Sequence, residues 1–312
     1  MKASFINTTH IEGLVYDHDL QIKVSGPESK APNTEFITGT VSIATDNAVT
    51  NIIAIHFTYI VAKTSKGTDN NTFTVLKNII DGTIGTYMKD GPEKAGKIRV
   101  DSAIALNEFY TDRNGKEELV STKRNEGGFV HTCDFLVDDE RNRNTFKCDM
   151  LITNATRIEA NPEKNIPERV IVKGCVFDFR KALLPVEFTA TSTGAMNYFE
   201  DLGASPSNPT LTCVWGNQIS EVVVNRYTEE SAFGEPSVRE VKSTRRDFVI
   251  TGASKEPQVW DDESTITAAE LKEAIAARET YLATIKTRQA EYKAKKAGAA
   301  TPAAPSNSAF NF

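Results

Sequence analysis

The chain has 312 residues, of which 39% are hydrophobic and 25% charged, an ordinary balance for a globular protein with two domains. No apolar run approaches the roughly 20 residues that cross a bilayer, and the first residues lack the apolar core of a secretion signal, so we expect a soluble, cytoplasmic protein. A net charge of −6 argues against coating of duplex DNA by charge alone and leaves room for a local basic groove.

The first part of the chain has the pattern of strands followed by one helix. Runs rich in β-branched and aromatic residues occupy residues 11–16, 21–24, 36–43 and 52–61. Apolar residues then follow at helical spacing, namely Phe73, Leu76, Ile79 and Ile80, with Asn71 or Thr72 as the cap. Because the runs 11–16 and 21–24 flank a polar turn, we interpret the region as three strands, followed by a short helix.

A hairpin follows this helix. Residues 98–106 alternate apolar and polar residues, the segments 109–116 and 118–120 follow, and Asn114-Gly115 stands between two strand-like runs there. Asn-Gly is a strong hairpin signal because a type I′ turn needs positive φ at both central residues. The resulting order is three strands, a helix and two strands, which is the order of an OB-fold barrel, and a common ligand of that fold is single-stranded nucleic acid.

The second half repeats this plan. Strands are expected at residues 148–158, 169–179, 184–191, 211–224 and 238–251, with a helical turn at 196–202. The last strands also share letters, because Ser-Thr-Lys-Arg at 121–124 matches Ser-Thr-Arg-Arg at 243–246. We interpret this as a weak duplication, with chance similarity as the alternative.

The C-terminal part has a different pattern. Residues 267–296 predict one long amphipathic helix, which opens on the capping box that starts at Thr267 and ends on lysines that suit its dipole. Its apolar stripe packs either on its own barrel or on a second copy of the chain. Residues 298–312 are rich in Ala, Pro, Ser and Asn and predict a disordered tail.

The predicted fold is therefore mainly β, with two OB-like five-stranded barrels in tandem, each with a short helix. The expected division is OB-fold domain 1 at residues 1–140, OB-like domain 2 at 141–256, an amphipathic helix at 264–297 and a disordered tail at 298–312.

Motifs of enzymes and metal sites are missing from the sequence. Neither a P-loop nor a Gly-x-Gly-x-x-Gly loop occurs, and the four histidines are scattered. The four cysteines, Cys133, Cys148, Cys175 and Cys213, form no Cys-x-x-Cys pair, so they predict buried thiols rather than zinc ligands or disulfides. We expect no catalytic residues, no metal and no cofactor.

Aromatic and basic residues are interleaved on the predicted strands, as single-stranded nucleic acid requires, because bases stack on aromatic faces and Lys or Arg follow the phosphates. The candidate binding residues are Phe57, Tyr59, Lys63, Lys66, Phe109, Tyr110, Arg113, Lys116, Lys123, Arg124, Trp215, Arg239, Lys242, Arg245 and Arg246. Phe57 and Tyr59 alternate on one strand and are expected to share a face. The alternative for each aromatic is a place in the core.

Residues 98–116 resemble the fourth strand and following hairpin of bacterial and phage single-stranded DNA-binding proteins. The shared features are alternating apolar residues, the aromatics Phe109 and Tyr110, and then Asp112, Gly115 and Lys116. With the strand order, the resemblance covers residues 5–137. It implies an OB-fold, no enzymatic activity and a role in DNA replication or recombination, with Phe57, Tyr59, Phe109 and Tyr110 placed to stack on bases.

The predicted function is sequence-tolerant binding of single-stranded DNA, with RNA as the alternative ligand, by a phage- or plasmid-type protein of the host cytoplasm. Further candidate contacts are self-association through residues 267–296 and replication proteins at the C-terminal tail, although the tail ends in aromatic rather than acidic residues. The alternative function is a structural protein of a virion or tail, whose β-rich domains and long helix serve assembly.

Overall fold

The structure, a computed structural model, describes residues 5–113, 115–161, 167–229 and 237–299, with only the backbone at 221–229, 237–243, 245 and 295–299. The strands are β1 (Asn7–His18), β2 (Gln21–Val24), β3 (Glu35–Ala44), β4 (Ile52–Val61), β5 (Lys97–Arg113), β6 (Lys116–Thr132), β7 (Asn144–Ile158), β8 (Arg169–Phe177), β9 (Leu183–Ala190), β10 (Thr210–Glu229) and β11 (Ser237–Ala253). The helices are α1 (Asn71–Ile80), α2 (Tyr87–Asp90), α3 (Thr193–Asp201), α4 (Ala268–Ala299) and the 3-10 turn η1 (Glu140–Asn142). The expected mainly β class and the long C-terminal helix are confirmed.

Five strands of the first half form a closed circuit of hydrogen-bonded pairs, which we call the first ring. β1 pairs with β3, β3 with β4, β4 in parallel with β6, β6 with β5, and β5 with β1. Its interior holds Ile37, Val41, Ile55 and Phe57, all fully buried. Alternation of apolar residues on β3 and β4 directs one face of each strand into this core.

Helix α1 lies between β4 and β5 in the chain and packs on the core of the first ring. Phe73, Leu76 and Ile79 are its buried contacts, as the helical spacing predicts. The N-cap is Asn70, one residue before the expected position, and its side chain accepts a hydrogen bond from the Thr72 N–H at 3.2 Å.

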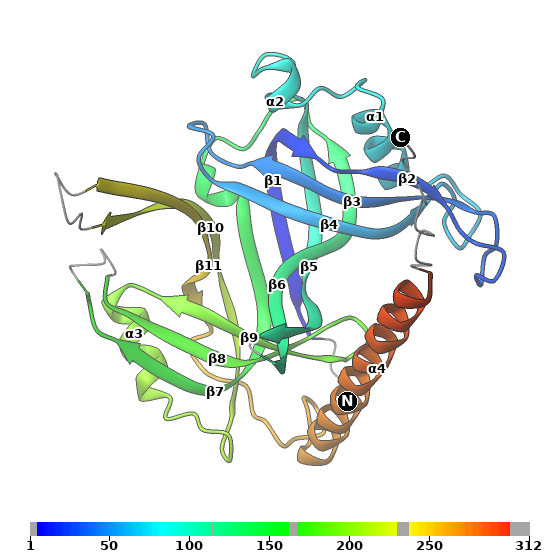
Figure 1. The fold of residues 1–312 in the computed structure, drawn as a ribbon. Helices are drawn as coiled ribbons and strands as arrows, with labels where there is room; N and C mark the ends of the chain where they lie inside the picture. The colour runs from blue at the N-terminus through cyan, green and yellow to red at the C-terminus, as the bar shows by residue number, and fades with distance from the viewer. Residues whose placement is uncertain (1–4, 114, 162–166, 230–236, 300–312) are drawn as a thin grey trace, which may run out of the picture.

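The second half forms a second ring with the same order of pairs. β7 pairs with β8, β8 with β9, β9 in parallel with β11, β11 with β10, and β10 with β7. Helix α3 lies between β9 and β10 in the chain, and Met196 and Phe199 are its buried core contacts. Figure 1 shows the first ring at the top and the second at the lower left.

The two rings are joined along β1 and β7, which pair in antiparallel register from Asn7↔Cys148 to Ile11↔Asn144, so that all eleven strands belong to one sheet. A buried amide pair adds to this joint. The Asn125 side chain donates to Gln218 Oε1 at 2.8 Å and accepts from Gln218 Nε2 at 3.0 Å. Each amide satisfies the other, which a buried polar group requires.

Both rings have a long hairpin between their last two strands. β5 and β6 pair as far as Arg113↔Lys116, which confirms the predicted hairpin; Asn114 lies outside the described residues, and Gly115 has φ 75°. β10 and β11 pair as far as Glu229↔Ser237. Ile104 on β5 belongs to the core of the second ring, and Leu106 packs against the same core.

Helix α4 runs beside the β5–β6 hairpin at the right of Figure 1 and packs on its own chain. Arg278 forms an ion pair of 2.5 Å with Glu108. Gln289 accepts a hydrogen bond from the Tyr110 N–H at 2.7 Å. Leu271 and Ala274 pack against the outside of the second ring. Among the described residues, no helix combines the length and apolar character that a membrane span needs.

Candidate nucleic-acid interface

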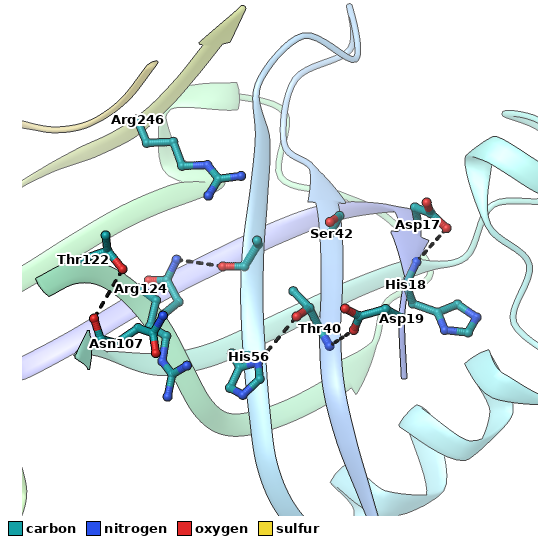
Figure 2. A pocket seen from close by; sticks show the side chains of 12 residues that line it. Asp17, His18, Asp19, Thr40, Ser42, His56, Asn107, Thr122, Arg124 and Arg246 are labelled. Atoms are coloured by element: carbon teal, nitrogen blue, oxygen red, sulfur yellow. Dashed lines mark hydrogen bonds between the residues drawn. The ribbon is translucent and has the colours of Figure 1, made fainter. Parts of the chain in front are cut away.

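A groove of about 480 Å³ opens on the outer face of the first ring. Its lining residues come from β1 and the turn after it, β3, β4, β5, β6 and β11, and are Asp17, His18, Asp19, Thr40, Ser42, Ala54, His56, Asn107, Thr122, Arg124, Asn125 and Arg246. Figure 2 shows the arginines at one side of the groove and the aspartates at the other. A single cavity therefore collects cationic, anionic and neutral polar groups.

Strands β3 and β4 form the floor of the groove. Thr40, Ser42 and His56 line it, whereas Val41 and Ile55 beside them are buried in the core. Because neighbouring residues of a strand point to opposite faces, the apolar core of the ring fixes the polar face outward.

Arg124 and Arg246 form the basic wall. The guanidinium of Arg124 donates to Glu126 Oε2 from Nε at 3.1 Å and from Nη2 at 2.8 Å, which holds it in place. Arg246 comes from the second ring and is exposed. It forms no ion pair or hydrogen bond with the described part of the chain, so its five N–H donors are open to a ligand.

The opposite wall is acidic. Asp17 accepts a hydrogen bond from the His18 N–H at 2.8 Å, and Asp19 accepts one from the Thr40 N–H. The N–H of Asp19 donates to the Thr40 carbonyl at 3.0 Å, which ties the turn after β1 to β3. Both carboxylates are therefore oriented by backbone groups.

His56 lies on the floor between the two walls. Partial burial and the positive charge of Arg124 lower its pKa below the ordinary 6.5, against smaller raising effects of Glu126 and Asp19. The imidazole is thus neutral at neutral pH and offers a flat ring, and its Nδ1 lies 3.4 Å from Thr40 Oγ1.

Phe57 and Tyr59 do not share a face. Phe57 is 0% exposed and Tyr59 is 44% exposed. The reason is a β-bulge, because Gly39 pairs with Phe57 and Ile37 with Ile60, which places one extra residue on β4. The bulge shifts the alternation, so Ile60 packs on the core and Tyr59 turns outward. The expected stacking role of Phe57 is corrected, since its ring offers no face to a ligand.

Tyr59 and the lysines after it are accessible. The Tyr59 ring lies 4.5 Å from the ring of Phe36, the first aromatic of β3. Lys63 and Lys66 are exposed in the turn beyond β4, where Lys63 pairs with Asp69 at 2.6 Å. Phe36 was not among the sequence-predicted residues; the alternation along β3, with Ile37 facing the core, was the signal that could have found it.

The aromatics of the β5–β6 hairpin lie apart from the groove. Phe109 is 37% exposed, while Tyr110 is half-buried beside α4, with Lys286 Nζ 5.6 Å from its ring. Arg113 and Lys116 are exposed at the tip of the hairpin. None of these four residues lines the groove.

Lys123 contacts the second ring, unlike its neighbour Arg124, which pairs with Glu126. Its ammonium donates to the Glu187 carbonyl and lies 5.5 Å from the ring of Phe188 and 5.4 Å from that of Phe248. Burial lowers the pKa of Lys123. We therefore correct its expected role in phosphate binding, because its donors serve the contact between the rings.

The remaining predicted residues lie on the second ring. Trp215 is partly exposed on β10 and lies over Gly252, where a Cβ would meet the indole nitrogen at 2.3 Å. Arg239, Lys242 and Arg245 are on β11, and their side chains fall outside the described part. Of the basic cluster on β11, Arg246 is thus the residue whose place in the groove is defined.

Among the described residues, no three His, Cys, Asp or Glu side chains are grouped to hold a metal. Burial raises the pKa of Cys175 to about 12 and that of Cys213 to about 11, so these thiols are protonated at neutral pH. Cys148 is buried as well.

Fold and groove together define a β-rich protein that has two rings of the same strand order and a polar groove on the first ring. The chain belongs to the YorF family, whose family model matches residues 6–288. No curated protein matches the sequence.

Two solved structures of the single-stranded DNA-binding protein from Thermus aquaticus are similar to this chain. The wild-type structure is 10% identical with a TM-score of 0.43, and the match covers 82% of this chain and 96% of that one. A variant of the same protein with a deletion and one substitution is 10% identical with a TM-score of 0.43, over 83% of this chain and 98% of that one. Values this low transfer no function to this chain.

Proposed function

We propose that this protein binds single-stranded DNA along the outer face of β3 and β4, and that both rings are OB-type barrels with domain limits near residues 1–140 and 141–256. The order of strand pairs and the helix between the third and fourth strands of each ring are those of an OB-fold. In OB-folds the face of the second and third strands binds oligonucleotides, and here those strands are β3 and β4. The position of the groove on that face carries the proposal.

The proposed binding track continues from the groove along β3. Outward residues alternate with core residues and are Phe36, Thr38, Thr40 and Ser42. Six residue steps separate the first from the last, about 20 Å of strand. Tyr59 and Phe36 present an aromatic pair at one end, and Arg124 and Arg246 present positive charge at the other. Such a track suits a short single-stranded segment, at the lower end of the about 4 to 16 nucleotides that OB-folds bind.

The first ring is the ligand-binding ring in this proposal, because the corresponding face of the second ring is occupied. Cys175, Phe177 and Leu183 on the outside of β8 and β9 are buried in one apolar cluster with Leu271 of α4 and Trp260 before it. An ion pair of 2.9 Å between Lys173 and Glu187 bridges the same two strands.

In this proposal the protein is not an enzyme and acts in DNA replication or recombination in the cytoplasm, the host cytoplasm if a phage encodes it. The alternative, an assembly protein, predicts a discrete oligomer that forms without nucleic acid and ignores it. Size-exclusion chromatography with and without an oligonucleotide separates the two functions.

Fluorescence anisotropy with a labelled oligothymidine of about 30 bases tests the proposal, with the matching duplex and oligouridine as competitors. Binding should weaken as salt rises, because each phosphate contact releases counterions, and the duplex should fail to displace the ligand. The competition by oligouridine reports the preference for DNA over RNA. Absence of binding at low salt, or equal displacement by duplex, would contradict the proposal.

Arg246→Ala tests the groove itself. Loss of one phosphate contact should weaken binding about threefold to tenfold and lower the slope of log affinity against log salt by about 0.7. Lys255→Ala, an exposed cation outside the groove, is the matched control and should leave both quantities unchanged. Equal effects of the two substitutions would place the ligand elsewhere.

A further inference from the structure

We propose that the acidic wall of the groove selects bases, so that Asp17 and Asp19 favour bases with an exocyclic amino group over thymine. This inference rests on the proposed binding of single-stranded DNA. The inference gives these two residues a role in base selection. They would have no such role if the groove held only the DNA backbone.

The first observation is the separation of charge across the groove. Arg124 and Arg246 stand at one side, and Asp17 and Asp19 at the other, with His56 between them (Figure 2). Phosphates are repelled by carboxylates and attracted by guanidinium groups. A strand in this groove therefore places its backbone at the arginines and turns its base edges toward the aspartates.

The second observation is that both carboxylates are held in position with one oxygen available. In each, Oδ1 accepts a backbone hydrogen bond, from His18 in the case of Asp17 and from Thr40 in the case of Asp19. Neither Oδ2 has a hydrogen bond with the described residues. An oriented carboxylate loses little freedom when it accepts a further hydrogen bond.

The third observation is that Asp19 has its place only because residue 39 is glycine. A Cβ at Gly39 would lie 2.8 Å from both the carbonyl oxygen and Oδ1 of Asp19, and the φ of Gly39 is +131°. The turn after β1 therefore lies directly on β3 and carries Asp19 over the edge of the groove floor.

The chemistry of the bases then sets the preference. An ionised carboxylate only accepts hydrogen bonds. Cytosine offers the N4 amino group and adenine the N6 amino group as donors, and Asp is a known partner of cytosine N4. Thymine offers the O4 acceptor at the corresponding position, which a carboxylate repels. The acidic wall therefore distinguishes amino-bearing bases from thymine.

The test compares oligodeoxycytidine with oligothymidine of equal length by anisotropy, at slightly alkaline pH, where cytosine is unprotonated. The wild-type protein should bind the cytidine oligomer about fivefold more tightly. In the double variant Asp17→Asn and Asp19→Asn, the ratio should fall to about one. Asp138→Asn, an exposed carboxylate outside the groove, is the control and should keep the fivefold ratio.

Equal affinity of the wild-type protein for both oligomers, or a ratio that survives the double substitution, overturns the inference while binding itself stands. Tighter binding of both oligomers by the variant at an unchanged ratio also overturns it, because the aspartates would then only repel phosphate. Binding of neither oligomer by the wild-type protein overturns the proposed function as well. Asp17→Asn alone, which leaves the Asp19–Thr40 contact intact, should lower the ratio if the double variant unfolds.

Discussion

The two rings share one order of strand pairs, but the outer face of the first is polar and that of the second is apolar. On the first ring, β3 and β4 place a threonine, a serine and a histidine around an open groove. On the second, β8 and β9 turn Cys175 and Phe177 outward, and α4 with the segment before it buries them. The same order of strand pairs thus carries a polar groove on the first ring and a packed helix on the second, and the outward-facing residues distinguish the two faces.

Loss of the buried ion pair between α4 and the β5–β6 hairpin should give the largest effect, on stability. The Glu108 side chain is 1% exposed, so Arg278→Ala leaves a buried carboxylate without its partner. We expect the free energy of unfolding to fall by about 3 kcal/mol in chemical denaturation. Affinity for oligothymidine should not change, because α4 does not line the groove.

Arg288→Ala is the control for this substitution, since Arg288 is exposed on the same helix. A stability loss as large for Arg288→Ala would show that the ion pair is not the cause. A loss of affinity in folded Arg278→Ala protein would show that the covered side also contributes to binding.

Tyr59→Ala should have the next largest effect, on affinity. One stacked base is worth about 1 to 3 kcal/mol, so we expect binding to weaken about tenfold in anisotropy measurements. Tyr281→Ala removes a tyrosine of similar exposure from α4 and should leave affinity unchanged. If both variants bind like the wild-type protein, the aromatic end of the track on β3 and β4 has no part in binding.

A change of pH should have the smallest effect. Since the pKa of His56 is lowered, the folded protein holds this imidazole neutral where an unfolded chain begins to protonate it. Stability contributed by His56 is therefore present above the ordinary pKa of 6.5 and is lost as pH falls through the lower folded value. Protonation also adds a positive charge beside Arg124, so affinity for oligothymidine should rise about threefold as pH falls through this range.

His56→Gln should abolish the pH-dependent rise in affinity, whereas His131→Gln, outside the groove, should keep it. The other histidine of the groove, His18, accepts a hydrogen bond from the Leu20 N–H at Nδ1. A rise that persists in His56→Gln would show that His56 is not its cause.

Local patterns predicted the elements well. Helical spacing from Phe73 to Ile80 gave α1, and Gly115 marked the β5–β6 hairpin. The two-residue alternation of a strand predicted wrongly that Tyr59 shares a face with Phe57. The β-bulge that separates them depends on how β4 pairs with β3, which the sequence of residues 52–61 alone does not show.

Residues that touch distant parts of the chain were less predictable. Lys123 resembles a solvated cation in the sequence, and only its contacts with β9 and β11 make it a half-buried donor. In each ring, one β-bulge interrupts the pairing of the last two strands, and the next paired residue toward the hairpin is Glu126 in β6 and Ile250 in β11. When these two residues are aligned, Ser-Thr-Lys-Arg at 121–124 and Ser-Thr-Arg-Arg at 243–246 lie two positions apart. The groove is likewise lined by Asp17, His56 and Arg246, which are far apart in the sequence. No local sequence pattern predicts that such distant residues lie together.

The β1–β7 seam has a consequence for dissection of the chain. Residues 7–11 of β1 find their partners at 144–148, beyond the expected limit of the first domain. A fragment that stops at residue 140 would carry an unpaired strand edge with Ile11 beside it, which invites pairing with another molecule. Proteolytic or recombinant separation near that limit should therefore yield aggregation rather than two independent modules, and the half-proteins should recover solubility when they are expressed together.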